Sequence, residues 1–306
     1  DVSGQRRGAR RLRGPRLARG RLPVVPGCLG RAPVDGAATL GRGGSELTAT
    51  LLARALDASQ VTLWKDVPGL LTADPRVVPD ARLLPHLHLD EAAELAYYGA
   101  KVLHPRALLP LAGRRIPLFV RPFAEPDAPG TEISARRDDD RSPVRALSAV
   151  ADQALVTISG SGILGVPGMA ARTFAALQEA GISVSLIAQA SSEYTIDFTM
   201  PASVSTEAVQ VLRRAFRAEI RTGEINGVEV RNRIAIIAIV GLRMAGHPGI
   251  AARVFVSLHD LEPALGRKDP ATYRGLDKAA CIWTWHHPSR HLDSSPMLAL
   301  LGENRT

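Results

Sequence analysis

An internal repeat with a constant offset of 81 residues constrains the fold of this 306-residue chain more than any other feature. Residues 158–177 and 239–258 share their apolar positions, a Pro-Gly pair and an arginine in one register. The matched pairs are Ile158/Ile239, Gly160/Gly241, Pro167/Pro248, Gly168/Gly249, Ala170/Ala251, Ala171/Ala252, Arg172/Arg253, Phe174/Phe255 and Leu177/Leu258. A strand, a turn and a helix start that recur together predict two copies of one small α/β unit.

The first copy has the signals of a complete domain. An apolar strand over residues 154–159 is followed by a helix that Pro167 and Gly168 open and Gly181 closes. Strand patterns follow at 182–187, 194–200 and 228–230, with a helical pattern over 205–216. The order βαββαβ predicts a ferredoxin-like domain over residues 144–232.

The second copy, residues 233–258, ends abruptly after Leu258. The first copy continues there with two strands, whereas residues 259–306 are rich in Pro, Arg, His and Trp. This break resembles a change of reading frame, so we expect residues 259–306 to form a disordered or out-of-frame tail. Cys281 and the histidines of this tail match no zinc signature, and we expect no bound metal there.

Strand and helix signals also alternate in the first half of the chain, which predicts an α/β unit with a mainly parallel sheet over residues 22–135. Strands are expected over 22–30, 61–64 and 116–120, and helices over 47–56 and 90–98. Ser45 is the expected N-cap of the first helix. Pro105 opens a further helix, in which the preceding His104 caps or packs. Residues 121–143, rich in Pro, Asp and Arg, suit a linker.

The net charge of +8 comes mostly from residues 1–21, which contain eight arginines and one acid. The remainder of the chain carries only +1, and only 4% of all residues are aromatic, which argues against a nucleic-acid-binding surface. We expect residues 1–21 to be a basic, disordered segment. The longest apolar run, residues 234–242, is too short to span a membrane, and two widely separated cysteines fit a cytoplasmic location.

Residues 41–47, Gly-Arg-Gly-Gly-Ser-Glu-Leu, form the most informative motif of the first half. Glycines let the backbone approach a ligand closely, and free N–H groups at a helix start attract anions. Arg42 can bind a carboxylate or phosphate through two parallel hydrogen bonds. The motif therefore predicts an anion-binding loop, and a tight turn capped by Ser45 is the purely structural alternative.

Further charged residues follow the strand over 61–64. Lys65 and Asp66 come directly after it, and Asp74 and Arg76 lie in the next loop. Ligands bind at the carboxyl ends of strands in α/β sheets, so these residues are candidates for a nucleotide, its phosphates and a metal ion. Lys101, beside a helix start, is a candidate phosphate ligand. The alternative is a solvated loop with local ion pairs.

Together these motifs resemble the aspartate kinase family. The kinase-like motifs are residues 40–45, 64–69, 72–76 and 94–105, and residues 165–168 and 187–193 resemble the paired ACT domains that follow. The resemblance covers residues 22–258. It implies an α/β fold: part of a three-layer αβα amino-acid-kinase sandwich, followed by ferredoxin-like βαββαβ ACT domains of which the second is incomplete.

The resemblance also implies an activity, namely transfer of the γ-phosphoryl group of ATP to the β-carboxylate of L-aspartate with Mg²⁺. This is the first step of lysine, threonine and methionine biosynthesis. Arg42 would bind the aspartate carboxylate, Ser45 would contact the substrate, and Glu46 would orient the site. The residues that would surround the nucleotide are Lys65, Asp66, Asp74, Arg76 and Lys101.

The ACT-like part implies feedback regulation by lysine or threonine and a homodimer formed through the ACT domains. The helix that begins at Gly168 offers backbone N–H groups to an effector carboxylate. The candidate effector residues are Gly168, Met169, Gln189, Ser191 and Ser192. The alternative is that these residues only shape a turn or a domain interface.

This sequence departs from the family pattern in two ways. Glu46 stands where the family commonly has aspartate. The N-terminal lobe with its Lys-Phe-Gly-Gly motif does not occur in this sequence, so we expect little or no kinase activity from this chain alone. A second interpretation stays open: a stand-alone amino-acid-binding ACT module with a kinase remnant that does not turn over.

Overall fold

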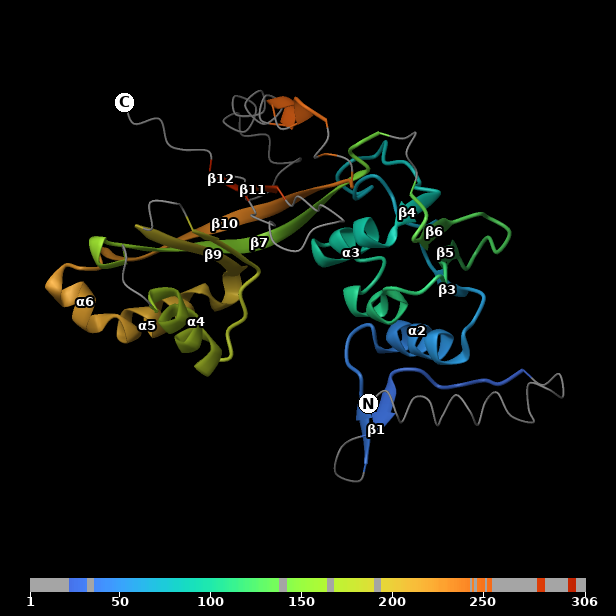
Figure 1. Cartoon of the computed structure of the whole chain (residues 1–306), viewed down its shortest axis with the longest axis horizontal. Helices are drawn as coiled ribbons and strands as arrows, with labels where there is room; N and C mark the ends of the chain where they lie inside the picture. The colour runs from blue at the N-terminus through green and yellow to red at the C-terminus, as the bar shows by residue number, and fades with distance from the viewer. Residues whose placement is uncertain are drawn as a thin grey trace. The chain divides into compact units, whose positions relative to one another are not determined.

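The computed structural model describes residues 22–31, 36–137, 142–163, 168–189, 194–242, 244, 247–250, 252–254, 280–283 and 297–300. The chain divides into two compact units (Figure 1). Unit 1 comprises residues 1–148 and 240–243, and unit 2 comprises residues 149–239 and 244–306. The division thus lies a few residues beyond the expected start of the first repeat copy, and residues 240–243 return to unit 1.

A four-stranded sheet of order β3-β5-β6-β4 organises unit 1. Its strands are β3 (Val61–Lys65), β4 (His86–His88), β5 (Leu118–Pro122) and β6 (Thr131–Ser134). The pairs β3/β5 and β4/β6 are parallel, but β5 and β6 are antiparallel, so the sheet is mixed rather than mainly parallel. The loop between β5 and β6 is too short for a parallel crossover, which requires a dozen or more residues. The linker expected over residues 121–143 therefore contains a sheet strand.

Among the described residues of unit 1, two helices and two 3₁₀ turns accompany this sheet. The helices are α2 (Gly44–Leu56) and α3 (Leu89–Tyr97), and the turns are η2 (Pro105–Ala107) and η3 (Leu109–Leu111). Helix α2 packs on β3, η2 and η3, while α3 packs on β4, β6 and η2. The helix expected from Pro105 is broken into two turns, because Pro110 has no N–H to continue an α-helix. The core includes the fully buried side chains of Leu87, Leu111, Leu118 and Ile133.

The strand expected over residues 22–30 is much shorter. Only β1 (Leu29–Arg31) forms, and it pairs with β2 (Ala37–Thr39) as an antiparallel hairpin. Leu22 and Val24 are 90% and 91% exposed instead of buried. The residues before the hairpin include two prolines, which cannot donate hydrogen bonds to a sheet.

Unit 2 contains the expected ferredoxin-like fold. The chain order is β7 (Ala146–Ser159), α4 (Met169–Glu179), β8 (Leu186–Gln189), β9 (Thr195–Pro201), α5 (Ser205–Ala215), α6 (Arg217–Thr222) and β10 (Gly227–Val240), with the turns η4 (Ser161–Ile163) and η5 (Ala202–Val204). The sheet order β10-β7-β9-β8, with β9 antiparallel to both of its neighbours, confirms βαββαβ. Figure 1 shows α4 and α5 against one face of this sheet. Phe198 and Phe216 are fully buried in the core that the sheet and these helices share. No described helix of the chain combines the length and apolar character needed to cross a membrane.

The structure extends the repeat beyond what the sequence shows. Strands β7 and β10 are related along their whole length by the same offset, and each bends at a residue with positive φ, Asp152 at 56° and Arg233 at 58°. The turns before the helices also match, with φ of 89° at Gly168 and 88° at Gly249. The repeat thus begins near the start of β7, where the paired sequences share too few residue types to be recognised.

The glycines that end the two long strands have equivalent surroundings. A Cβ on Gly160 would lie 2.3 Å from the carbonyl oxygen of Glu224, and one on Gly241 would lie 1.9 Å from that of Pro143. No side chain fits at either position without moving the backbone opposite. Gly160 follows the end of β7 and lies against the segment that leads into β10, while Gly241 follows the end of β10 and lies against the segment that leads into β7. Both positions therefore require glycine.

The equivalence ends at the outer edge of β10. Strand β11 (Ala280–Trp283) occupies the position beside β10 that β9 occupies beside β7, but it runs parallel to β10, whereas β9 runs antiparallel to β7. Strand β12 (Met297–Leu300) then pairs with β11. Within the described residues, the second copy is therefore not completed as the first one is.

Candidate active site

The Gly-Arg-Gly-Gly loop leads directly into α2, and Gly43 rather than Ser45 is the N-cap. Gly43 has a φ of 70°, and a Cβ there would lie 2.4 Å from the Cβ of His104. Ser45 lies exposed in the first turn of the helix. The expectation that Ser45 caps the helix is therefore wrong, because the left-handed conformation that a glycine supplies already ends the loop two residues earlier. Helix α2 has no side-chain cap, which leaves N–H groups of its first turn available to a ligand.

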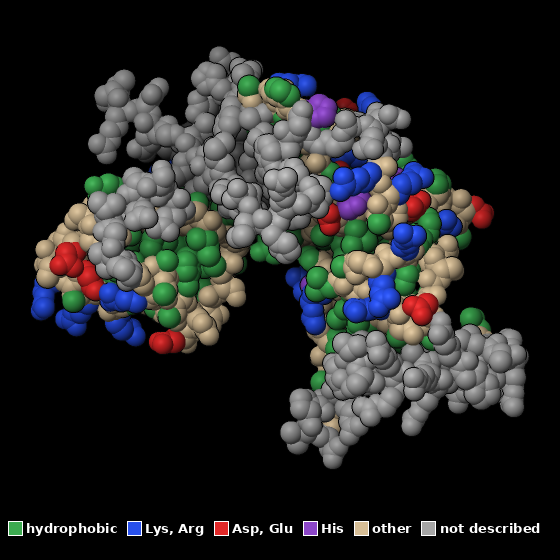
Figure 2. All heavy atoms as spheres, viewed as in Figure 1, with side chains coloured by type: hydrophobic (Ala, Val, Ile, Leu, Met, Phe, Trp, Pro, Cys, Tyr) green, Lys and Arg blue, Asp and Glu red, His purple; other side chains and the backbone are tan. Residues whose placement is uncertain are grey.

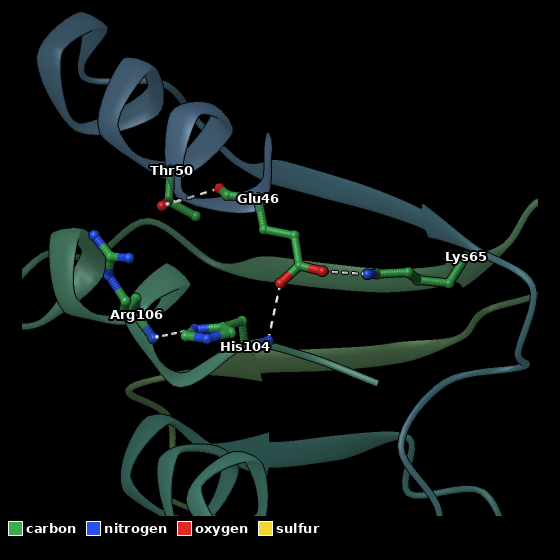
Figure 3. A network of polar contacts seen from close by, with 5 residues as sticks. All are labelled: Glu46, Thr50, Lys65, His104 and Arg106. Atoms are coloured by element: carbon green, nitrogen blue, oxygen red, sulfur yellow. Dashed lines mark hydrogen bonds and ion pairs between the residues drawn. The ribbon is translucent and has the colours of Figure 1, made fainter. Parts of the chain in front are cut away.

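Glu46 is the centre of a polar network at the start of α2 (Figure 3). One carboxylate oxygen pairs with the ammonium of Lys65, at the end of β3. The other oxygen accepts a hydrogen bond of 2.9 Å from the backbone N–H of His104. The side chains of Glu46 and Lys65 are only 17% and 22% exposed. Each carboxylate oxygen therefore has a partner, and Glu46 holds Lys65 in place at the end of β3.

The segment around His104 also holds the glycine loop. The Nδ1 of His104 accepts a hydrogen bond of 3.2 Å from the backbone N–H of Arg106. The Arg106 guanidinium in turn donates to the carbonyl oxygen of Leu40, at 3.0 Å. His104 thus caps η2, as expected from its place before Pro105. Sequence reasoning missed Arg106, although its position directly after the motif of residues 94–105 was an available signal.

Arg42 lies beside this network and is exposed. Its guanidinium has no hydrogen bond or ion pair with any other described residue. Four positive features therefore lie at or near the start of α2: the Arg42 guanidinium, a lysine held by Glu46, an arginine on the loop backbone and an uncapped helix N-terminus. Glu46 is the one acidic group of the network and is paired with the lysine, so the arrangement suits an anionic ligand.

Three of the five nucleotide candidates lie together in a second group. The carboxylate of Asp74 accepts hydrogen bonds from the backbone N–H of Arg76 at 3.0 Å and from its Nε and Nη2 at 3.0 and 2.6 Å. The side-chain bonds from Arg76 lower the pKa of Asp74 below its ordinary value, against a smaller raising effect of partial burial. The positive charge of Lys101 adds to the lowering, so Lys101 lies near this pair. Asp66 is exposed beside Lys65 at the end of β3.

Mg²⁺ fits these residues only as an ion that arrives with a nucleotide. Among the described residues, no three His, Cys, Asp or Glu side chains gather into a metal site. Mg²⁺ commonly binds one or two carboxylates together with substrate phosphates and water. The exposed carboxylates of Asp66 and Asp74 meet that requirement without a preformed cage.

The effector candidates of unit 2 are only partly described. Gly168 is the N-cap of α4, and this helix too lacks a side-chain cap. The Met169 side chain is 5% exposed and belongs to the core, so only its backbone is available to an effector. Gln189 is the last residue of β8, while Ser191 and Ser192 lie outside the described residues.

Comparisons with known proteins agree with both halves of this arrangement. The model of the amino acid kinase family matches residues 9–122, and the model of the ACT domain matches residues 156–216. The bifunctional aspartokinase/homoserine dehydrogenase of Haemophilus influenzae is 43% identical over 219 residues, which are 72% of this chain and 27% of that protein. The chain belongs to the aspartate kinase family. Chloroplastic aspartokinase 2 of Arabidopsis thaliana is 38% identical over 223 residues, 72% of this chain and 41% of that protein.

Solved structures of aspartate kinases have the same fold. Aspartokinase III of E. coli in complex with aspartate and ADP matches with a TM-score of 0.69 and 33% identity, over 86% of this chain and 57% of that chain. The same enzyme in complex with lysine and aspartate matches with a TM-score of 0.64 and 35% identity, over 84% and 56%. The chain thus spans less than half the length of the two curated relatives described above.

Proposed function

We propose that this chain forms part of an aspartate kinase and binds L-aspartate at the start of α2. One observation carries the proposal: Glu46 is paired with Lys65 and with the His104 N–H, while Arg42 has no partner among the described residues. A guanidinium forms two parallel hydrogen bonds with a carboxylate, and a helix N-terminus adds N–H donors. Ser45, exposed in the same turn, supplies a hydroxyl for the bound amino acid.

The nucleotide would lie against the second group of charged residues. Arg76 and Lys101 offer positive charge to phosphates. Arg76 is already paired with Asp74, whereas the Lys101 ammonium forms no ion pair with another described residue. In phosphoryl transfer the protein mainly positions the reactants and stabilises the charge of the phosphoryl oxygens. Mg²⁺ bound to ATP supplies further charge neutralisation, with Asp66 or Asp74 as its protein ligand. Figure 2 shows Lys and Arg side chains over the visible face of unit 1, with Asp and Glu side chains among them.

Unit 2 would provide the regulation. We propose that lysine or threonine binds near the start of α4, where Gly168 leaves the helix uncapped. Support comes from the relative that was solved in complex with lysine and aspartate. We further propose that two copies of the chain pair through their ACT sheets, since β8 lies at an edge of its sheet. The two distant cysteines suit a reducing cytoplasm.

Calorimetric titration of the full 306-residue chain with L-aspartate tests the substrate assignment. We expect saturable binding that Arg42→Gln weakens at least tenfold, because a charged bidentate contact is lost. Arg54→Gln, on the exposed side of the same helix, is the matched control and is expected to bind aspartate normally. Absence of aspartate binding, or equal binding by the Arg42 variant, would refute the proposal.

A second function is favoured by the repeated turn, in which Gly168 and Gly249 have nearly the same φ, and by the uncapped start of α4 after Gly168. This function is amino-acid sensing without phosphoryl transfer. The same calorimeter distinguishes the two: lysine or threonine binding without any aspartate binding supports the sensor. A coupled assay of aspartate-dependent ADP release adds the catalytic readout, and robust turnover would exclude the sensor interpretation.

A further inference from the structure

The first residues of β7 contact both loops that carry the nucleotide candidates. The backbone N–H of Leu147 donates a hydrogen bond of 2.8 Å to the carbonyl oxygen of Thr72. The hydroxyl of the next residue, Ser148, donates one of 2.5 Å to the carbonyl oxygen of Tyr98. All four residues belong to unit 1. Two consecutive strand residues, whose Cα atoms are about 3.8 Å apart, thus bring the two loops to one place.

The first loop is fixed at its base, and its tip is exposed to solvent. Thr72 exchanges hydrogen bonds with Arg82: its N–H donates to the Arg82 carbonyl at 2.8 Å, and its hydroxyl accepts from the Arg82 N–H at 2.9 Å. Asp74 and Arg76 lie between these anchors and are exposed. The bond from Leu147 is therefore made to the base of the loop, two residues before Asp74.

The second loop follows α3 directly. Tyr98 is 7% exposed, and its backbone N–H donates the last hydrogen bond of α3, to the carbonyl oxygen of Glu94. Gly99 then turns the chain with a φ of 103°, and Lys101 projects from the turn as an exposed side chain. Two hydrogen bonds anchor the chain before Lys101: the Tyr98 carbonyl accepts from Ser148, and the Ala100 N–H donates to the carbonyl oxygen of Leu95 at 2.9 Å.

The start of β7 is itself well anchored in unit 1. Arg145 donates from its backbone to the Val240 carbonyl at 2.8 Å and from its guanidinium to the His86 carbonyl at 2.6 Å. The buried carboxylate of Glu91 accepts the N–H of Leu242 at 3.1 Å. The segment that contacts the two loops is therefore held to β4 and α3, so it can act as a fixed reference for them.

We propose that Ser148 is a positioning residue that sets the Lys101 turn relative to the Asp74–Arg76 loop. This inference rests on the proposed nucleotide role of those loops. The hydroxyl of Ser148 is the only side-chain group of the contact, because Leu147 uses its backbone. Two phosphate-binding cations on separate loops bind one nucleotide well only when their separation is already fixed, since ordering them on binding costs affinity.

Nucleotide titrations of the full chain test the proposal. We expect Ser148→Ala to weaken the binding of Mg·ADP about fivefold, the loss typical of one neutral hydrogen bond, and to leave aspartate affinity unchanged. Ser148→Thr keeps the hydroxyl and is expected to restore ADP binding. Ser159→Ala is the matched control: it removes a half-buried hydroxyl from the same strand that has no hydrogen bond with described residues. Unchanged ADP affinity in Ser148→Ala, or equal weakening of ADP and aspartate, would overturn the proposal.

Amide hydrogen exchange separates a failure of this inference from a failure of the proposed function. Ser148→Ala should speed exchange about fivefold at residues 99–103 and leave residues 44–50 unchanged. If this exchange does not change, Ser148 does not position the turn, whatever the nucleotide result. If the wild-type chain binds no ADP, the nucleotide role of both loops is refuted, and with it the functional part of the inference.

Discussion

Replacement of Gly43 by alanine should destabilise the start of α2 by much more than the same replacement at Gly41. Both glycines have positive φ, 70° at Gly43 and 74° at Gly41, so alanine at either position costs about 1–2 kcal/mol in backbone strain. At Gly41 the new methyl group meets no described atom within 4 Å. At Gly43 it would lie 2.4 Å from Cβ and 2.5 Å from Cγ of His104. Gly41→Ala is therefore a control that isolates the contact with His104.

The magnitude at Gly43 follows from these distances. Carbon atoms pack best at about 3.5–4.0 Å, so His104 must move by about 1 Å or more. Overpacking of this kind costs about 1–3 kcal/mol, which adds to the strain for a total of about 2–5 kcal/mol. The movement also displaces the His104 N–H from Glu46, so Lys65 loses its fixed partner. We expect weaker aspartate binding from Gly43→Ala for this reason.

Amide hydrogen exchange over residues 44–56 measures the effect locally, since unfolding of a two-unit chain is not described by one transition. The difference of about 1–3 kcal/mol between the two variants corresponds to roughly five- to 150-fold faster exchange in Gly43→Ala. Equal exchange rates in the two variants would show that no tight contact with His104 exists, and the reasoning about the loop would fail.

Three further results are expected. The pKa of Asp74 is lowered, so its interaction with Arg76 stabilises the fold above the ordinary pKa of about 3.9, and this stabilisation is lost as the pH falls through the lower pKa of the folded state. A carbon-13 NMR titration should show that the pKa of Asp74 rises in Arg76→Met, whereas an unchanged pKa would show that the pair does not exist. Gly160→Ala should destabilise unit 2 by about 3 kcal/mol or more because its Cβ meets a backbone carbonyl, whereas Gly168→Ala, which is strained but not crowded, should cost about 1–2 kcal/mol. Urea unfolding monitored by amide hydrogen exchange at β7 compares the two variants, and a larger loss for Gly168→Ala would contradict the packing at Gly160. Burial raises the pKa of Tyr98 to about 12, so the ultraviolet titration of Tyr98→Phe should lack the tyrosine ionisation that occurs at the highest pH. A titration curve that is unchanged at high pH would disprove this burial.

The failures of sequence reasoning have local physical causes. Ser45 has the right chemistry for an N-cap, but Gly43 ends the loop earlier because its contact with His104, distant in sequence, leaves room only for hydrogen. β6 was taken for a linker because its flanks are rich in Pro and Asp, whereas its own Thr131 and Ile133 are buried against β5. Such contacts between distant segments leave no periodic signal in the sequence.

The sequence by itself determined the family, the βαββαβ order of the first repeat and the residue types of the candidate site, because glycines, charges and apolar spacing are written locally. The tertiary structure decided which charges are free and which are neutralised. Glu46 was a candidate for orienting the site, and only folding brings Lys65 and the His104 N–H to it while leaving Arg42 without a partner in the described part of the chain. Folding also places Ser148 beside Tyr98, fifty residues away in the chain. Pairing across such distances depends on packing of whole elements, which no local pattern specifies.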